Sequence, residues 1–140
     1  MKKVIIIVIS LAVIIGIVYA VSYTASHTEG DIVQLTDPKD EIKAAAEDGI
    51  GEGESIDDIS INDKNLTITV TISEESEDHA KSRFGSITDE ILNVDDFNSV
   101  KIIFTGVGSI TGTSDQISDG PAGKYFDTEK MGGDYPFIGE

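Results

Sequence analysis

A run of 18 residues without a charged side chain, residues 4–21, constrains this chain more than any other feature of its sequence. An α-helix of that length is roughly 27 Å long, at about 1.5 Å per residue, which is close to the hydrocarbon core of a bilayer at about 30 Å. Lys2 and Lys3 precede the run, and acidic residues follow it. Because positive charge favours the cytoplasmic side, we expect a single-pass cell-membrane protein with a cytoplasmic amino terminus and an extracytoplasmic remainder.

The same segment allows a second interpretation, a signal peptide that is cleaved after Ala20 and releases a secreted protein. The apolar run is longer than the about 7 to 15 residues typical of such peptides, and Tyr19 and Tyr23 fit an interfacial aromatic belt. A type IV pilin leader is disfavoured because no Gly or Ala precedes the run. We therefore favour a membrane anchor or uncleaved signal sequence over residues 1–21, in contact with the lipid bilayer through residues 4–21, and leave cleavage open.

The charge balance excludes one large class of partners. The chain has 26 acidic and 10 basic residues, and two of the basic residues lie before the apolar run. A surface this acidic repels phosphate backbones, so we expect no nucleic-acid binding. The chain has no cysteine, which rules out a disulfide framework, a thiolate nucleophile, a zinc site built on cysteine and a lipid-modified cysteine.

The polar, aperiodic residues 22–36 are typical of a tether. Asp37 followed by Pro38 is a helix start signal, because the Asp side chain can cap the helix and Pro is favoured at its first position. That helix is expected to run to Gly49, and an acidic, glycine-rich loop follows it.

Two strands and a second helix are predicted next. Residues 59–61 and 66–72 are rich in β-branched side chains, with strict alternation in the second segment, and residues 62–65 are expected to join them as a four-residue hairpin loop. Ser76 is the expected cap of a helix with acidic residues in its first turn. The apolar stripe of that helix consists of Ala80, Phe84, Ile87 and Ile91.

A last strand at residues 100–105 completes the expected fold class, which is α+β. It comprises an N-terminal transmembrane helix and a small α-β-β-α-β extracytoplasmic domain at residues 37–105, with a three-stranded sheet of undetermined strand order and two helices on one of its faces. Without disulfides, a core of this size contributes no more than about 3 to 5 kcal/mol, so we expect support from a partner, a second copy or the tail.

Residues 106–140 are expected to form an irregular, glycine-rich acidic tail. They nevertheless contain Tyr125, Phe126, Tyr135 and Phe137, which are uncommon in a solvated, disordered segment. Three interpretations stay open for the tail: packing along its own domain, disorder, or docking into a groove of a partner.

No residue pattern predicts catalysis. His27 and His79 have no companion that would make a site with them, and no Gly-x-Ser-x-Gly elbow occurs. The adjacent acidic pairs are typical of solvated or capping carboxylates, at Asp57 and Asp58, Glu74 and Glu75, and Asp95 and Asp96. We therefore assign no catalytic, cofactor-binding or metal-ligating residue.

Three weaker patterns occur in the sequence. The acidic residues between positions 47 and 58 suit a divalent cation in ligand type, but neither they nor residues 115–120 form a recognised calcium loop. The glycines of residues 106–112 resemble a phosphate loop only superficially, because no helix pattern or Gly-Lys-Ser/Thr follows. Asn65 begins a glycosylation sequon, and its modification stays open.

These observations lead to one functional hypothesis and one alternative. The hypothesis is a non-catalytic, membrane-anchored extracytoplasmic module that binds a protein partner or self-associates, as an accessory subunit of a membrane or envelope complex. The alternative is a secreted, acidic binding protein for a divalent cation or a small solute.

Overall fold

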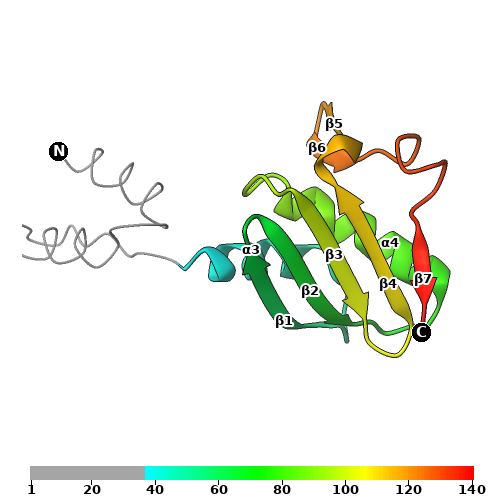
Figure 1. Ribbon diagram of the computed structural model, residues 1–140. Coiled ribbons are helices and arrows are strands. Elements are labelled where there is room, and N and C mark those ends of the chain that lie inside the picture. The colour runs from blue at the N-terminus through cyan, green and yellow to red at the C-terminus, as the bar shows by residue number, and fades with distance from the viewer. Residues whose placement is uncertain (1–36) are drawn as a thin grey trace, which may run out of the picture. The chain divides into compact units, whose positions relative to one another are not determined.

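The computed structural model describes residues 37–140 (Figure 1). The predictions for the membrane segment at residues 1–21 and the tether at residues 22–36 lie outside these described residues. Within them, the chain is α+β, with two helices and a mixed sheet, as predicted. The elements in chain order are α3 (Pro38–Asp48), β1 (Ser55–Asn62), β2 (Asn65–Thr71), α4 (Glu77–Ile91), β3 (Ser99–Phe104), β4 (Gly108–Thr113), the 3-10 helix η1 (Ser114–Gln116), β5 (Ile117–Gly120), β6 (Gly123–Phe126) and β7 (Phe137–Gly139).

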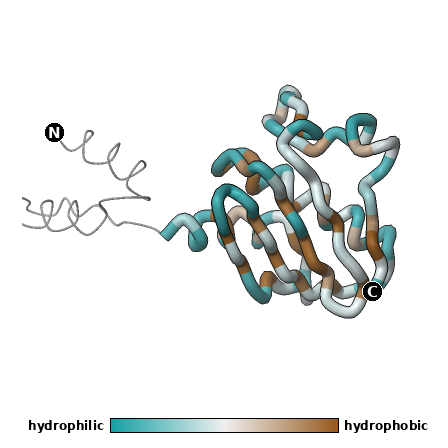
Figure 2. Tube along the Cα trace, viewed as in Figure 1, coloured by the Kyte–Doolittle hydropathy of each residue, from teal (hydrophilic) through white to brown (hydrophobic). Residues whose placement is uncertain are grey.

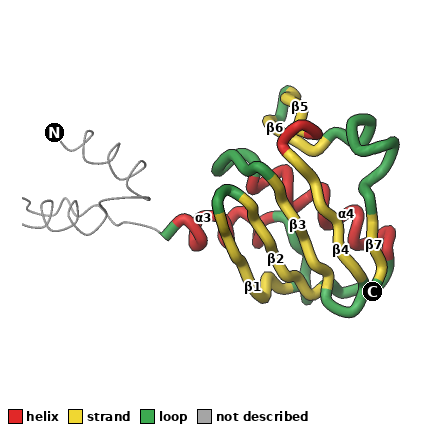
Figure 3. Tube along the Cα trace, viewed as in Figure 1, coloured by secondary structure: helices red, strands yellow, loops and turns green. Residues whose placement is uncertain are grey.

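The main sheet has five strands in the order β1-β2-β3-β4-β7. All neighbours are antiparallel except β2 and β3, which are parallel because α4 connects them as a crossover. Both helices lie behind the sheet as it is viewed in Figure 3. A separate hairpin of β5 and β6 lies beyond one end of the sheet.

The core forms between the helices and the facing side of the sheet, as strand alternation predicts. On β2, Leu66, Ile68 and Val70 are buried, whereas the threonines between them are partly exposed. Figure 2 shows this as hydrophobic segments alternating with paler ones along the strands. The predicted apolar stripe of α4 is confirmed, since all four of its residues are fully buried. One buried row of isoleucines crosses four strands in register: Ile59, Ile68, Ile102 and Ile110.

The predicted three-stranded sheet and irregular tail are wrong. Residues 106–140 supply β4 and β7, which extend the sheet, and the β5–β6 hairpin. The aromatic residues explain why the tail is ordered, because they pack on the domain. The ring of Phe84 on α4 has its centroid 5.5 Å from that of Phe126 and 5.0 Å from that of Tyr135. Of the three interpretations left open, packing along its own domain is the one found.

Two glycines permit this packing of the tail. A Cβ at Gly112 on β4 would lie 2.5 Å from a ring carbon of Phe126, and one at Gly85 on α4 would lie 3.0 Å from the hydroxyl of Tyr135. Glycine is unfavourable in the interior of a helix or strand. At both positions that cost is offset because an aromatic side chain from the tail occupies the space.

The hairpin between β1 and β2 is tighter than predicted. Its strands extend to Asn62 and resume at Asn65, so the turn consists of Asp63 and Lys64 alone rather than four residues. Both turn residues have positive φ, 49° and 66°, as a two-residue hairpin turn of type I′ requires. The predicted cap of the second helix is confirmed, since the Ser76 hydroxyl accepts a hydrogen bond from the His79 N–H at 3.2 Å.

Candidate functional site

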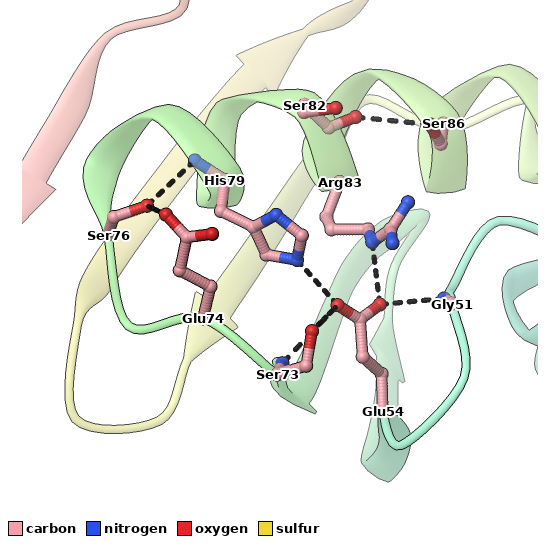
Figure 4. A network of polar contacts seen from close by, with 9 residues as sticks. All are labelled: Gly51, Glu54, Ser73, Glu74, Ser76, His79, Ser82, Arg83 and Ser86. Carbon is pink, nitrogen blue, oxygen red and sulfur yellow. Dashed lines mark hydrogen bonds and ion pairs between the residues drawn. The ribbon is translucent and has the colours of Figure 1, made fainter.

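The most developed polar cluster of the described chain surrounds the carboxylate of Glu54 (Figure 4). Glu54 lies at the end of a tight turn just before β1, where its N–H donates to the Gly51 carbonyl at 3.2 Å. The side chain folds back over this turn, and its Oε2 accepts from the Gly51 N–H at 2.7 Å. Its exposed fraction is 0%, so the protein must supply every partner of this charge.

Two residues of α4 face this carboxylate. The Nε2 atom of His79 lies 2.6 Å from Oε1, and the Nε atom of Arg83 lies 2.6 Å from Oε2. His79 and Arg83 are four positions apart, which places them on the same face of the helix. The Arg83 contact is an ion pair rather than a hydrogen bond, because its Nε has no acceptor in hydrogen-bond geometry.

Ser73, two positions after the end of β2, completes the cluster. Ser73 donates to Glu54 Oε1 from its N–H at 3.3 Å and from its hydroxyl at 3.1 Å. One carboxylate therefore connects the loop before β1, the carboxyl end of β2 and the first turns of α4.

The electrostatics of the cluster favour an ionised glutamate. Burial of the Glu54 carboxyl group raises its pKa, but hydrogen bonds from the Gly51 N–H, His79 and Ser73 outweigh burial and lower the pKa from 4.5 to about 2. A carboxylate with so low a pKa is a poor proton acceptor at neutral pH. The chemical role that this geometry supports for Glu54 is structural, as an anionic link between α4 and the sheet.

Sequence analysis found no companion that would make a catalytic or metal site with His79, and it did not identify the contact between His79 and Glu54. The spacing of His79 and Arg83 could have predicted an acidic partner. These two basic side chains are four positions apart on one helix face, and they need an acidic neighbour if they are partly buried. Nothing local distinguishes Glu54 from the other acids of the same loop. His27, the second histidine, lies outside the described residues.

Three of the six acidic residues considered for a cation at positions 47–58 contact different partners: Glu47, Glu54 and Asp57. Glu54 binds α4, while the carboxylate of Asp57 accepts from the hydroxyls of Thr71 at 2.6 Å and Ser55 at 2.7 Å, which lowers the Asp57 pKa. Glu47 lies 4.0 Å from Lys43 on the same helix. Among residues 37–140, no group of three or more acidic or histidine side chains is arranged to hold a metal ion.

The structure also shows where the residues of the other weak sequence patterns lie. Residues 115–120 span η1 and β5, and residues 106–112 span a turn and β4, which is followed by the three-residue η1 and not by an α-helix. Asn65 is exposed at the start of β2, where its Oδ1 accepts from the Ser99 hydroxyl at 2.8 Å. Glu74 accepts from the Ser76 hydroxyl at 2.9 Å, near the start of α4.

Ion pairs join the loop after α4 to the β1–β2 turn and to β6, at the opposite end of α4. Lys64 in the hairpin turn lies 3.1 Å from Asp95, and Lys124 on β6 pairs with Asp96. Two grooves of about 490 and 470 Å³ flank Lys124, the larger of them lined in part by Tyr125. All four ion-pair partners are substantially exposed, so these pairs contribute little to stability.

The face of the sheet opposite the helices carries a different surface. Across four strands in register, one row consists of Ser60, Thr67, Lys101 and Thr111. The neighbouring row consists of Asp58, Thr69, Ile103, Ser109 and Ile138. None of these side chains is buried, and Ile138 is 67% exposed. We call these nine residues the open face.

No family model, curated protein or solved structure matches this chain in the three comparisons made. Within residues 37–140, no helix is both long enough and apolar enough to span a bilayer.

Proposed function

We propose that this protein is a single-pass, membrane-anchored extracytoplasmic module that acts by binding a protein partner and does not catalyse a reaction. The anchor is the uncharged segment at residues 4–21, whose length suits a bilayer and whose flanking charges favour an extracytoplasmic domain. The acidic domain disfavours anionic lipid headgroups and nucleic acids as ligands, which leaves proteins as the partner class that its surface suits.

The observation that carries the proposal is the open face. The described part of the chain has helices on one side of its sheet only, while small hydroxyl side chains and two isoleucines line the other side. An antiparallel or mixed sheet can leave one face in water, so exposure alone is ordinary. Support for binding comes from Ile138, because a large exposed apolar side chain on an otherwise flat, polar surface suits a protein contact.

The site around Glu54 supports the absence of catalysis in this proposal. Its carboxylate is buried and held by hydrogen bonds and an ion pair, so it has no free position for a substrate. The open face, by contrast, is a broad sheet surface, which suits a protein interface better than a small-molecule reaction site.

Topology is the first experimental test. The chain has no cysteine, so a single Glu129→Cys substitution at an exposed position provides a unique label site. We expect a membrane-impermeant maleimide to label this variant in intact cells, and we expect the labelled protein to sediment with membranes. Labelling that requires permeabilised cells would contradict the proposed orientation.

Binding is tested separately by placing a photo-crosslinking amino acid at Thr69, in the centre of the open face, and at Glu129 as a control. We expect discrete crosslinked species of higher mass from position 69 and few from position 129. Equal crosslinking from both positions would argue against the open face as the binding surface.

A further inference from the structure

One long edge of the sheet is unpaired. β1 is the outermost strand, and within the described residues seven of its eight positions pair with β2, on one side only (Figure 1). An edge strand presents a row of N–H and C=O groups to which another extended chain can bind. The opposite edge is β7, which has only three residues, so β1 offers the longer template.

The tight hairpin determines which backbone groups of β1 face outward. In a two-residue hairpin, the residues that flank the turn, Asn62 and Asn65, exchange hydrogen bonds with each other. Antiparallel pairs alternate between bonded and non-bonded, so Ser60 also bonds to β2, whereas Ile59 and Ile61 direct their N–H and C=O groups away from it. A bulge between Ile56 and Asp58 limits regular pairing to this end of the strand.

The two faces of this edge differ in chemistry. On the helix side, Ile56 and Ile61 are only partly buried and pack at the margin of the core. On the open face, Asp58 is exposed, and no hydrogen bond or ion pair engages its carboxylate within the described chain. A strand added beside β1 would cover the partly buried isoleucines with one row of its side chains and would place the other row beside Asp58.

Charge determines which strand fits. Residues 44–63 contain seven acidic residues and no lysine or arginine. A second copy of this chain would bring Asp58 and its neighbours against the same charges, which is unfavourable between paired strands. The partner that complements this edge alternates apolar residues with lysine or arginine.

We propose that the free edge of β1 binds an extended segment of a partner protein in which apolar and basic side chains alternate, so that the segment adds a sixth strand to the sheet. This inference rests on the proposed binding function and names the chemistry of its partner. Backbone pairing through Ile59 and Ile61 supplies the geometry, the apolar row covers Ile56 and Ile61, and the basic row neutralises Asp58.

The test uses the full chain in detergent micelles and a fluorescent ten-residue peptide of alternating valine and lysine. We expect saturable binding by fluorescence anisotropy, and at least tenfold weaker binding of the matching valine–glutamate peptide. Hydrogen exchange at the amides of Ile59 and Ile61 is expected to slow when the lysine peptide is bound. A lysine peptide with an N-methyl group on every residue is expected to lose binding, because its backbone has no N–H left to pair with β1.

Matched variants separate edge pairing from general attraction between opposite charges. Asp58→Lys is expected to weaken peptide binding at least tenfold, whereas Glu129→Lys, with the same change in net charge at an exposed site in the tail, is expected to change it less than twofold. Asp58→Asn, which removes one charge without adding another, provides a milder variant if the lysine substitution perturbs folding. We expect Asp58→Asn to weaken peptide binding less than Asp58→Lys does and more than Glu129→Lys does.

Four outcomes would overturn the inference: equal loss in the two lysine variants, retained binding of the N-methylated peptide, dimers of the chain held through β1, or protection of the β1 edge in the free chain by its own residues 22–36. These outcomes are independent of the maleimide experiment. If the peptide fails to bind while position 129 is labelled in intact cells, the partner chemistry is wrong and the membrane topology stands. If the peptide binds while labelling requires permeabilised cells, the topology is wrong.

Discussion

The buried Glu54 carboxylate makes the stability of this domain depend on pH in a calculable way. Its pKa is lowered from 4.5 to about 2, and a shift of one unit corresponds to about 1.4 kcal/mol. The full shift would contribute about 3 kcal/mol at neutral pH as an upper limit. We expect about 2 kcal/mol, because the cluster lies near the surface and solvent screens part of the interaction.

The sign follows from the direction of the shift. A carboxyl group whose pKa is lower in the folded state binds protons more readily in the unfolded chain, so it stabilises the fold above the unfolded pKa of about 4.5. This contribution is lost as pH falls from about 5 towards 2. Below that range, protonated Glu54 and a neutral glutamine at the same position leave Arg83 equally unpaired.

The test compares the wild-type chain with Glu54→Gln. Urea unfolding of both full chains in a non-ionic detergent, followed by far-ultraviolet circular dichroism, gives the free energy of unfolding at each pH. We expect the variant to be less stable by about 2 kcal/mol at pH 7 and by much less at pH 2.5. Glu52→Gln, an exposed position in the same loop, serves as the control and is expected to stay within about 0.5 kcal/mol of wild type at both values. A penalty for Glu54→Gln that is the same at pH 7 and pH 2.5 would refute an ionised, hydrogen-bonded carboxylate.

Three further predictions concern the turn, the tail and the amino terminus. Gly112→Ala is expected to destabilise the fold by about 1 to 3 kcal/mol because its Cβ would displace Phe126, whereas Gly139→Ala, whose Cβ would meet a ring carbon at 3.6 Å, should have little effect in the same urea assay. Lys64→Gly is expected to stabilise the fold by about 0.5 to 1 kcal/mol because glycine adopts the positive φ of this position without strain, and a decrease in stability would contradict that reasoning. The intact mass of the purified chain is expected to include residues 1–21, whereas a mature chain that begins at Val21 would favour the secreted alternative.

The elements with a local signal are predictable from the amino-acid sequence. Alternation along β2 identified its buried face, and helical spacing identified the stripe from Ala80 to Ile91 on α4. Both are periodic patterns of side-chain burial, which arise wherever one face of a helix or strand packs against a core. The cap at Ser76 was equally readable, because a capping hydroxyl acts on an N–H only three residues away.

The remaining features become visible in the folded chain alone, because they depend on contacts between residues that are distant in the sequence. β4 contains glycine at Gly108 and Gly112, which interrupts the alternation of a strand, yet β3 pairs with it and both glycines lie against segments of the tail. Glu54 is one of several acids in its loop, and it becomes the partner of His79 and Arg83 because the turn at Gly51 directs it under α4. Strand order, and with it the free edge at β1, follows from this long-range pairing rather than from any local pattern.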